Sequence, residues 1–195
     1  MENLGITKEQ ADKLVEEYIT EPMTRLHLLE SEAIMRALAK HLKEDEEKWS
    51  IIGLLHDIDW DLTKNDHEQH CIKAQEILRR AGASDFLIET IISHGYDNET
   101  IPGLKDKKRE TAIQYCLVAA ETLTGIIIAS ALVQPDKKLS SVQLPSLKKK
   151  FKSKSFAANC NRDLVGECEK AGISLDDFLE IGLRALQEIS NKLGL

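Results

Sequence analysis

The chain of 195 residues is long enough for one domain with a sizeable core. Apolar residues make up 42% and charged residues 30%, which are the proportions of an ordinary soluble globular protein. The net charge of −7 argues against a protein that binds nucleic acid over its whole surface, although seven lysines and no acidic residue lie within 137–154. Four widely spaced cysteines and an N-terminus without a secretory pattern predict a reduced, cytoplasmic protein.

Apolar residues recur every three or four positions along most of the chain, which predicts amphipathic helices and an all-α fold. Thr7 and Gln10 predict a capping box, and Pro22 predicts the first turn of a second helix. Gly82 suits a helix end and Ser84 the next helix start. The predicted helices are 7–20, 22–42, 46–56, 67–81, 84–94, 109–133 and 174–192, with loops at 57–66 and 95–107 and short helices and loops within 136–160.

No repeat or linker divides the chain, so we expect one domain over residues 1–195. Its core would span about 22–133, with a C-terminal helical extension over about 136–195. Residues 111–133 contain one charged residue, Glu121, in 23, and a segment of that length could cross a bilayer. Polar residues such as Gln114 dilute the segment, so we prefer a core helix and expect no membrane association.

Four histidines and two acidic residues can bind metal ions and lie among apolar residues in the sequence. Each histidine shares its predicted helix face with apolar residues, as His27 does with Ile34 and Leu38, and should therefore point inward. His41 has similar neighbours, so helical phase alone does not select ligands. The predicted ligands are His27, His56, Asp57, His70, His94 and Glu121.

Glu121 is the strongest single indication of a cation. An ionised carboxylate in an apolar helix is costly unless a cation or good hydrogen-bond donors meet it. A buried lysine or arginine would serve as well as a metal ion, so both interpretations stay open at this point. Imidazole and carboxylate ligands suit Fe, Mn, Co, Ni or Zn, and six ligands could hold one or two ions. No cysteine is expected near the ligands, which disfavours a structural zinc site.

The same residues occur in three strings: LHLLESEAIMRALA around His27, GLLHDID around His56 and Asp57, and AAETLTGII around Glu121. In this order they resemble the HD-domain superfamily of metal-dependent phosphohydrolases. The similarity continues through HCIKAQEIL, ISHGYD and the lysine-rich segment, and covers nearly the whole chain, as in a subgroup of uncharacterised bacterial and archaeal HD hydrolases. The resemblance implies a single-domain helical bundle of HD type.

Within that superfamily, His70 and His94 match additional histidines of the binuclear branch, which includes hydrolases of symmetrical diadenosine tetraphosphate and HD-GYP cyclic-dinucleotide phosphodiesterases. The analogy implies one ion on His27, His56, Asp57 and Glu121 and a second on His70 and His94, with Asp57 as a bridge. No Gly-Tyr-Pro motif follows the HD pair, which argues against a cyclic dinucleotide substrate. Glu121 stands where the family usually has Asp, which implies a retuned, weakened, mononuclear or inactive site.

The expected reaction is hydrolysis of a phosphomonoester or phosphodiester, of a nucleotide in particular, by metal-activated water. Asp57 would bind metal and orient the attacking water. Arg25 and Lys64 are candidates for gripping substrate phosphate and Asp61 for supporting a ligand, with solvated surface charge as the alternative for the two cations.

The lysines of 148–154 could attract nucleic acid through its phosphates. We prefer a solvated basic helix that pairs with acidic surface in this chain or in a homodimer partner. Two further functions stay open: a di-iron oxygenase that uses the same ligands, and a non-catalytic helical binding module with a degenerate site. The substrate cannot be named from the fold, because one scaffold serves many phosphate esters.

Overall fold

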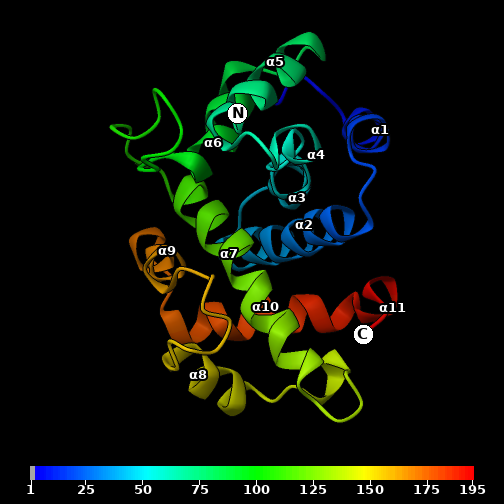
Figure 1. Cartoon of the computed structure of the whole chain (residues 1–195), viewed down its shortest axis with the longest axis vertical. Coiled ribbons are helices and arrows are strands. Elements are labelled where there is room, and N and C mark those ends of the chain that lie inside the picture. The colour runs from blue at the N-terminus through cyan, green and yellow to red at the C-terminus, as the bar shows by residue number, and fades with distance from the viewer. Residues whose placement is uncertain (1–2) are drawn as a thin grey trace.

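A computed structural model describes residues 3–195 (Figure 1). Within these residues the structure consists of α-helices and short 3-10 helices without a strand, which confirms the all-α prediction. The α-helices are α1 (Lys8–Tyr18), α2 (Pro22–Leu42), α3 (Glu46–Leu55), α4 (Trp60–Thr63), α5 (Ile72–Arg80), α6 (Asp85–Ile92), α7 (Ala112–Leu132), α8 (Leu144–Lys152), α9 (Arg162–Gly166), α10 (Leu175–Glu188) and α11 (Ser190–Leu193). The 3-10 helices are η1 (His67–Gln69), η2 (Ser93–Gly95), η3 (Leu139–Ser141) and η4 (Glu167–Ala171).

Helices α2 and α3 form the tightest pair in the molecule. A side chain at Gly53 would place its Cβ only 2.6 Å from the carbonyl oxygen of Ser31, so glycine lets the two helix backbones touch. Helix α7 crosses α2 near the centre of the molecule, and α10 packs against both of these helices (Figure 1). The continuous core that results includes fully buried Leu28 and Ile34 of α2.

Helix α7 has the length and hydropathy that would allow a membrane crossing. However, 61% of its apolar 18-residue stretch is buried inside the protein. Leu117, Leu123 and Ile127 on this helix are fully buried. Helix α7 is therefore the central core helix that we expected from the polar residues within this segment. Its apolar side chains are buried by the neighbouring helices and not by a bilayer.

The region after α3 differs from the sequence prediction. The predicted loop 57–66 contains α4, and the predicted helix 67–81 begins only at Ile72, after η1 and a turn at His70 and Cys71. The cause is Asp59, whose carboxylate accepts hydrogen bonds from the backbone N–H of Ala74 and from His70 Nδ1. This capping occupies an amide of the first turn of α5 and holds His70 outside the helix.

Helices α8, α9 and α10 pack against α7, α10 also packs against α2, and α11 packs on α10, so that the C-terminal region extends the same core (Figure 1). The lysine-rich helix α8 buries Leu147 and Phe151 and turns its lysines outward. Lys148 pairs with Asp176 of α10 at 2.9 Å. This pairing agrees with the interpretation of a solvated basic helix that meets acidic surface.

Candidate metal centre

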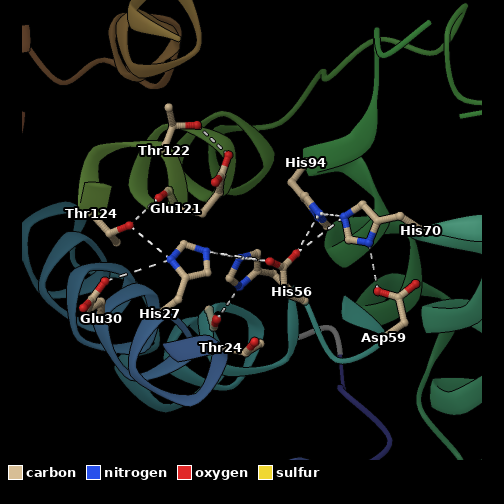
Figure 2. Close-up of polar contacts among 12 residues, drawn as sticks. Thr24, His27, Glu30, His56, Asp59, His70, His94, Glu121, Thr122 and Thr124 are labelled. Carbon is tan, nitrogen blue, oxygen red and sulfur yellow. Dashed lines mark hydrogen bonds and ion pairs between the residues drawn. The ribbon is translucent and has the colours of Figure 1, made fainter. Parts of the chain in front are cut away.

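The first pair of site histidines comes from the tight α2–α3 unit. His27 lies in the second turn of α2, and His56 directly follows the last residue of α3 and is fully buried. Their Nε2 atoms face one another at 3.1 Å (Figure 2). Because both residues are anchored by long or closely packed helices, the backbone alone brings the two ring nitrogens together.

The second pair comes from turns at helix ends. His70 follows η1, and His94 is the middle residue of η2, directly after α6. Their Nε2 atoms are 3.0 Å apart (Figure 2). The arrangement therefore repeats that of the first pair, with ligands supplied by a different type of local structure.

Asp57 lies between the two pairs and offers one oxygen to each. Its Oδ2 is 3.8 Å from His27 Nε2 and 3.6 Å from His56 Nε2. Its Oδ1 is 3.5 Å from His70 Nε2 and 3.3 Å from His94 Nε2. A carboxylate in this position can bridge two cations, each held by one histidine pair.

The hydrogen bonds on the far side of each ring determine where the protons lie. His56 Nδ1 donates to the Gly53 carbonyl, His94 Nδ1 to the Ile91 carbonyl, and His70 Nδ1 to the Asp59 carboxylate. Thr124 uses its own hydroxyl proton on the Glu121 carbonyl, so it accepts from His27 Nδ1. In the neutral tautomers all four Nε2 atoms therefore present lone pairs to one another and to a carboxylate.

Four lone pairs and a carboxylate repel one another unless a positive charge lies among them. The spacing fits a metal ion, because two nitrogens bound at about 2.1 Å and at right angles lie about 3 Å apart. Within residues 3–195 no lysine or arginine forms an ion pair with Asp57 or Glu121. The alternative in which a lysine or arginine neutralises these acids is thereby removed.

The pKa values describe the same demand for positive charge. Burial lowers the pKa of His56 to about 3, which keeps this ring neutral despite the adjacent Asp57. Burial also disfavours the charged form of His70, but hydrogen bonds to Asp59 and Cys71 raise its pKa to about 10. Burial opposes ionisation of Asp57, yet the surrounding imidazoles hold its pKa well below the ordinary value. The cluster thus keeps its carboxylate ionised and favours cations beside it.

Glu121 lies on α7 at the wall of the same site, but its carboxylate is not in the ligand cluster. Its Oε1 accepts a hydrogen bond from the Thr122 hydroxyl at 2.5 Å (Figure 2). Burial raises its pKa, with the charge of His27 opposing that shift. The two groups of ligand atoms that lie within 4.8 Å of one another are His27, His56 and Asp57, and His70, Cys71 and His94.

Two predicted substrate-binding cations lie outside the site. Arg25 donates from Nε to the Ile19 carbonyl, and Lys64 pairs with Glu21 at 3.0 Å. Neither lines the pocket at the cluster, because each is held by the chain around the start of α2. Asp61 has a related structural role: it accepts from the N–H groups of Thr20 and Glu21 and from the Thr24 hydroxyl, and so holds the chain that leads into α2, the helix of His27.

The cluster opens into a pocket of about 550 Å³. Its polar lining is neutral apart from the candidate ligands and the exposed ring of His67, and among the described residues no lysine or arginine lines it. Apolar and aromatic surface is supplied by Trp60, Ile101 and Leu164. The amides and hydroxyls that line it are Asn98, Thr100, Thr122, Thr124, Asn159 and Asn161.

Four supporting residues were not identified from the sequence. Asp59 and Thr124 orient His70 and His27 through hydrogen bonds. Buried Arg109 donates to the carbonyls of Ser93 and Tyr96 and so fixes the turn that carries His94. Cys71 was expected to lie away from the ligands, but its Sγ is 3.7 Å from His94 Nε2. Only Cys71 had a sequence signal, namely its position next to His70.

Comparison with known proteins gives one match. The family model for the HD domain matches residues 24–129, which is more than half of the chain. No curated protein and no solved structure matches. The matched segment contains all six predicted ligands, from His27 to Glu121.

Proposed function

Because this chain belongs to the HD-domain family, whose members are generally metal-dependent phosphohydrolases, we propose that it hydrolyses a phosphomonoester or phosphodiester at a two-metal site. The observation that carries the proposal is the convergence of four Nε2 atoms on the two oxygens of Asp57. An isolated hydrogen-bonded histidine is common in protein cores, but four imidazoles around one buried carboxylate form a set of ligands that suits divalent transition metals.

In the proposed site, His27, His56 and the Oδ2 atom of Asp57 hold one divalent transition metal ion. His70, His94 and the Oδ1 atom of Asp57 hold the other. Glu121 is an additional carboxylate beside the first ion. When bound, such ions acidify water and offset charge on phosphoryl oxygens.

The remaining side chains define how a substrate would be held. Amides and hydroxyls of the pocket, such as Asn98, Thr100 and Asn161, can donate to phosphate and sugar oxygens. Trp60 lies at 5.5 Å from the ring of His67, and these rings offer a surface on which a nucleobase can stack. The volume of about 550 Å³ lies within the range of about 300–1,000 Å³ of small-molecule sites, which supports a nucleotide-sized substrate.

Metal analysis and a substrate screen test this proposal together. We expect close to two transition metal ions per chain after reconstitution, and turnover of at least one nucleoside monophosphate, dinucleoside polyphosphate, cyclic dinucleotide or chromogenic phosphodiester. His56→Ala should abolish turnover and reduce the metal content. His41→Ala is the matched control, because His41 is also on an amphipathic helix but is exposed and outside this pocket.

Two outcomes would contradict the hydrolase. One is a fully metallated protein that cleaves none of these substrates. The other is a mixed-valent iron signal with oxygen consumption, which is the behaviour of the oxygenase alternative. Loss of metal from His41→Ala would instead show that the ligands lie elsewhere.

A further inference from the structure

Cys71 directly follows His70 and is fully buried beside the second histidine pair. Its Sγ is 3.7 Å from His94 Nε2, and the ligand atoms of His70, Cys71 and His94 all lie within 4.8 Å of one another. We propose that Cys71 is a thiolate ligand of the second metal ion. This inference rests on the second metal position of the proposed function, but not on the reaction.

The backbone at Cys71 supports a dedicated role. Cys71 has φ 64° and ψ −27°, a left-handed conformation that residues with a Cβ rarely adopt. Glycine or asparagine would adopt this conformation more readily at the start of α5. With cysteine at this position, the turn places a sulfur atom 3.7 Å from His94 Nε2.

The neighbouring chain leaves space for the sulfur. A Cβ at position 95 would lie 2.8 Å from Cys71 Sγ, so Gly95 is the residue that permits the close approach. Gly95 follows His94 in η2, and the same turn thus positions an imidazole and makes room for a thiol. The turn at Cys71 thus carries the sulfur atom, and the turn at His94 and Gly95 leaves the space that the sulfur occupies.

A thiolate would make the two metal positions chemically different. The second position would have two imidazole nitrogens, one carboxylate oxygen and one sulfur, with the thiol proton released to solvent as the ion binds. The first position would have only nitrogen and oxygen ligands. Sulfur ligands favour Zn²⁺, Fe²⁺ and Co²⁺ over Mg²⁺ and Mn²⁺, so the second position is the one that we expect to select for softer ions.

Substitution of Co²⁺ tests the ligand without a substrate. Co²⁺ bound to a thiolate has a near-ultraviolet charge-transfer band, and we expect the metal-free wild-type protein to gain this band on titration with Co²⁺. Cys71→Ser should lose the band while retaining the visible ligand-field bands of an ion at the first position. Cys168→Ser is the matched control, because Cys168 is equally buried but belongs to neither group of candidate ligands, and it should keep the band.

Each other result overturns the assignment. A wild-type protein that binds two Co²⁺ ions without the band has no thiolate ligand, and a protein that binds none has no such site. A band that survives in Cys71→Ser but disappears in Cys160→Ser would assign the sulfur to Cys160, the cysteine that lines the pocket. Far-ultraviolet circular dichroism of each variant confirms folding. Hydrolysis without the band would refute this inference alone, and the band without hydrolysis would refute the proposed function alone.

Discussion

The two histidine pairs have nearly the same geometry but are built differently. His27 and His56 lie in and at the end of regular helices that touch through Gly53. His70 and His94 lie in turns that side chains from elsewhere, Asp59 and Arg109, hold in place. The difference teaches that equal ligand spacing can arise from backbone packing in one half of a site and from polar side-chain contacts in the other.

This comparison has a consequence for how each half can fail. The first pair depends on the α2–α3 interface, which is part of the main core. The second pair depends on a few hydrogen bonds and on Cys71 with its positive φ, and single substitutions of the supporting side chains should therefore disturb it before the first pair.

The largest effect is expected at the residue that the two halves share. Asp57→Ala removes the carboxylate between the pairs, so metal content should fall at both positions and turnover by a factor on the order of 10³ or more, as for loss of a central electrostatic group. Metal analysis and initial rates measure both effects. If only one ion is lost, Asp57 serves one pair and the two halves are independent.

Arg109→Ala should strongly destabilise the protein and affect the second pair first. The change leaves the Glu167 carboxylate with only Lys170, at 3.2 Å, and leaves two carbonyls of the His94 turn without their donor. Buried polar groups that lose their partners cost about 1–3 kcal/mol each, which urea denaturation would detect. Arg184→Ala is the control, because its pair with Glu180 is exposed and should contribute less than about 1 kcal/mol. Equal stability of the two variants would contradict the role given to Arg109.

Asp59→Asn should act on the second pair alone. The amide has one acceptor oxygen in place of two, so it cannot accept from both His70 Nδ1 and the Ala74 N–H. Loss of such support lowers metal affinity by about 10–100-fold, and a two-step calorimetric titration should show this for one ion. Thr124→Val removes the hydroxyl that accepts from His27 Nδ1, and it should weaken binding of the other ion, at His27 and His56. Weakening of the same step by both variants would refute the division into two halves.

Asp61→Ala should have the smallest effect. It removes the acceptor for the Thr20 and Glu21 N–H groups before α2, and the loss of such hydrogen bonds costs about 1 kcal/mol. Asp61→Asn retains an acceptor oxygen and should be milder. Thermal unfolding measures the melting temperatures, which we expect to fall from wild type to Asp61→Asn to Asp61→Ala. An unchanged melting temperature in Asp61→Ala would show that α2 does not depend on this contact.

The sequence predicted the first half of the site better than the second because regular helices have a fixed period. The bounds of α2 followed from Pro22 and the apolar repeat, and the inward position of His27 followed from the same repeat. The Ser84 cap of α6 was also correct. Each of these inferences needed only residues within one helix.

The second half could not be predicted in the same way because it depends on contacts between distant residues. The helix that was expected to begin at 67 begins only at Ile72, where Asp59 accepts from the Ala74 N–H, so His70 lies outside the helix and helical phase does not explain its burial. The same error hid Cys71, since a helix would have turned the sulfur about 100° away from His70. Arg25 and Lys64 were chosen by charge and position in sequence, neither of which shows which way a long side chain extends.

The neutral lining of the pocket has a consequence for how the protein would be controlled. Without a lysine or arginine among the described residues of its wall, phosphate has no fixed positive charge to meet there apart from bound ions. Whether metal ions are bound at the cluster would then determine both the binding of the substrate and its conversion. The supply of transition metal in the cell would set the fraction of molecules able to take up a phosphate ester, and moderate changes in ionic strength would have little influence on that uptake.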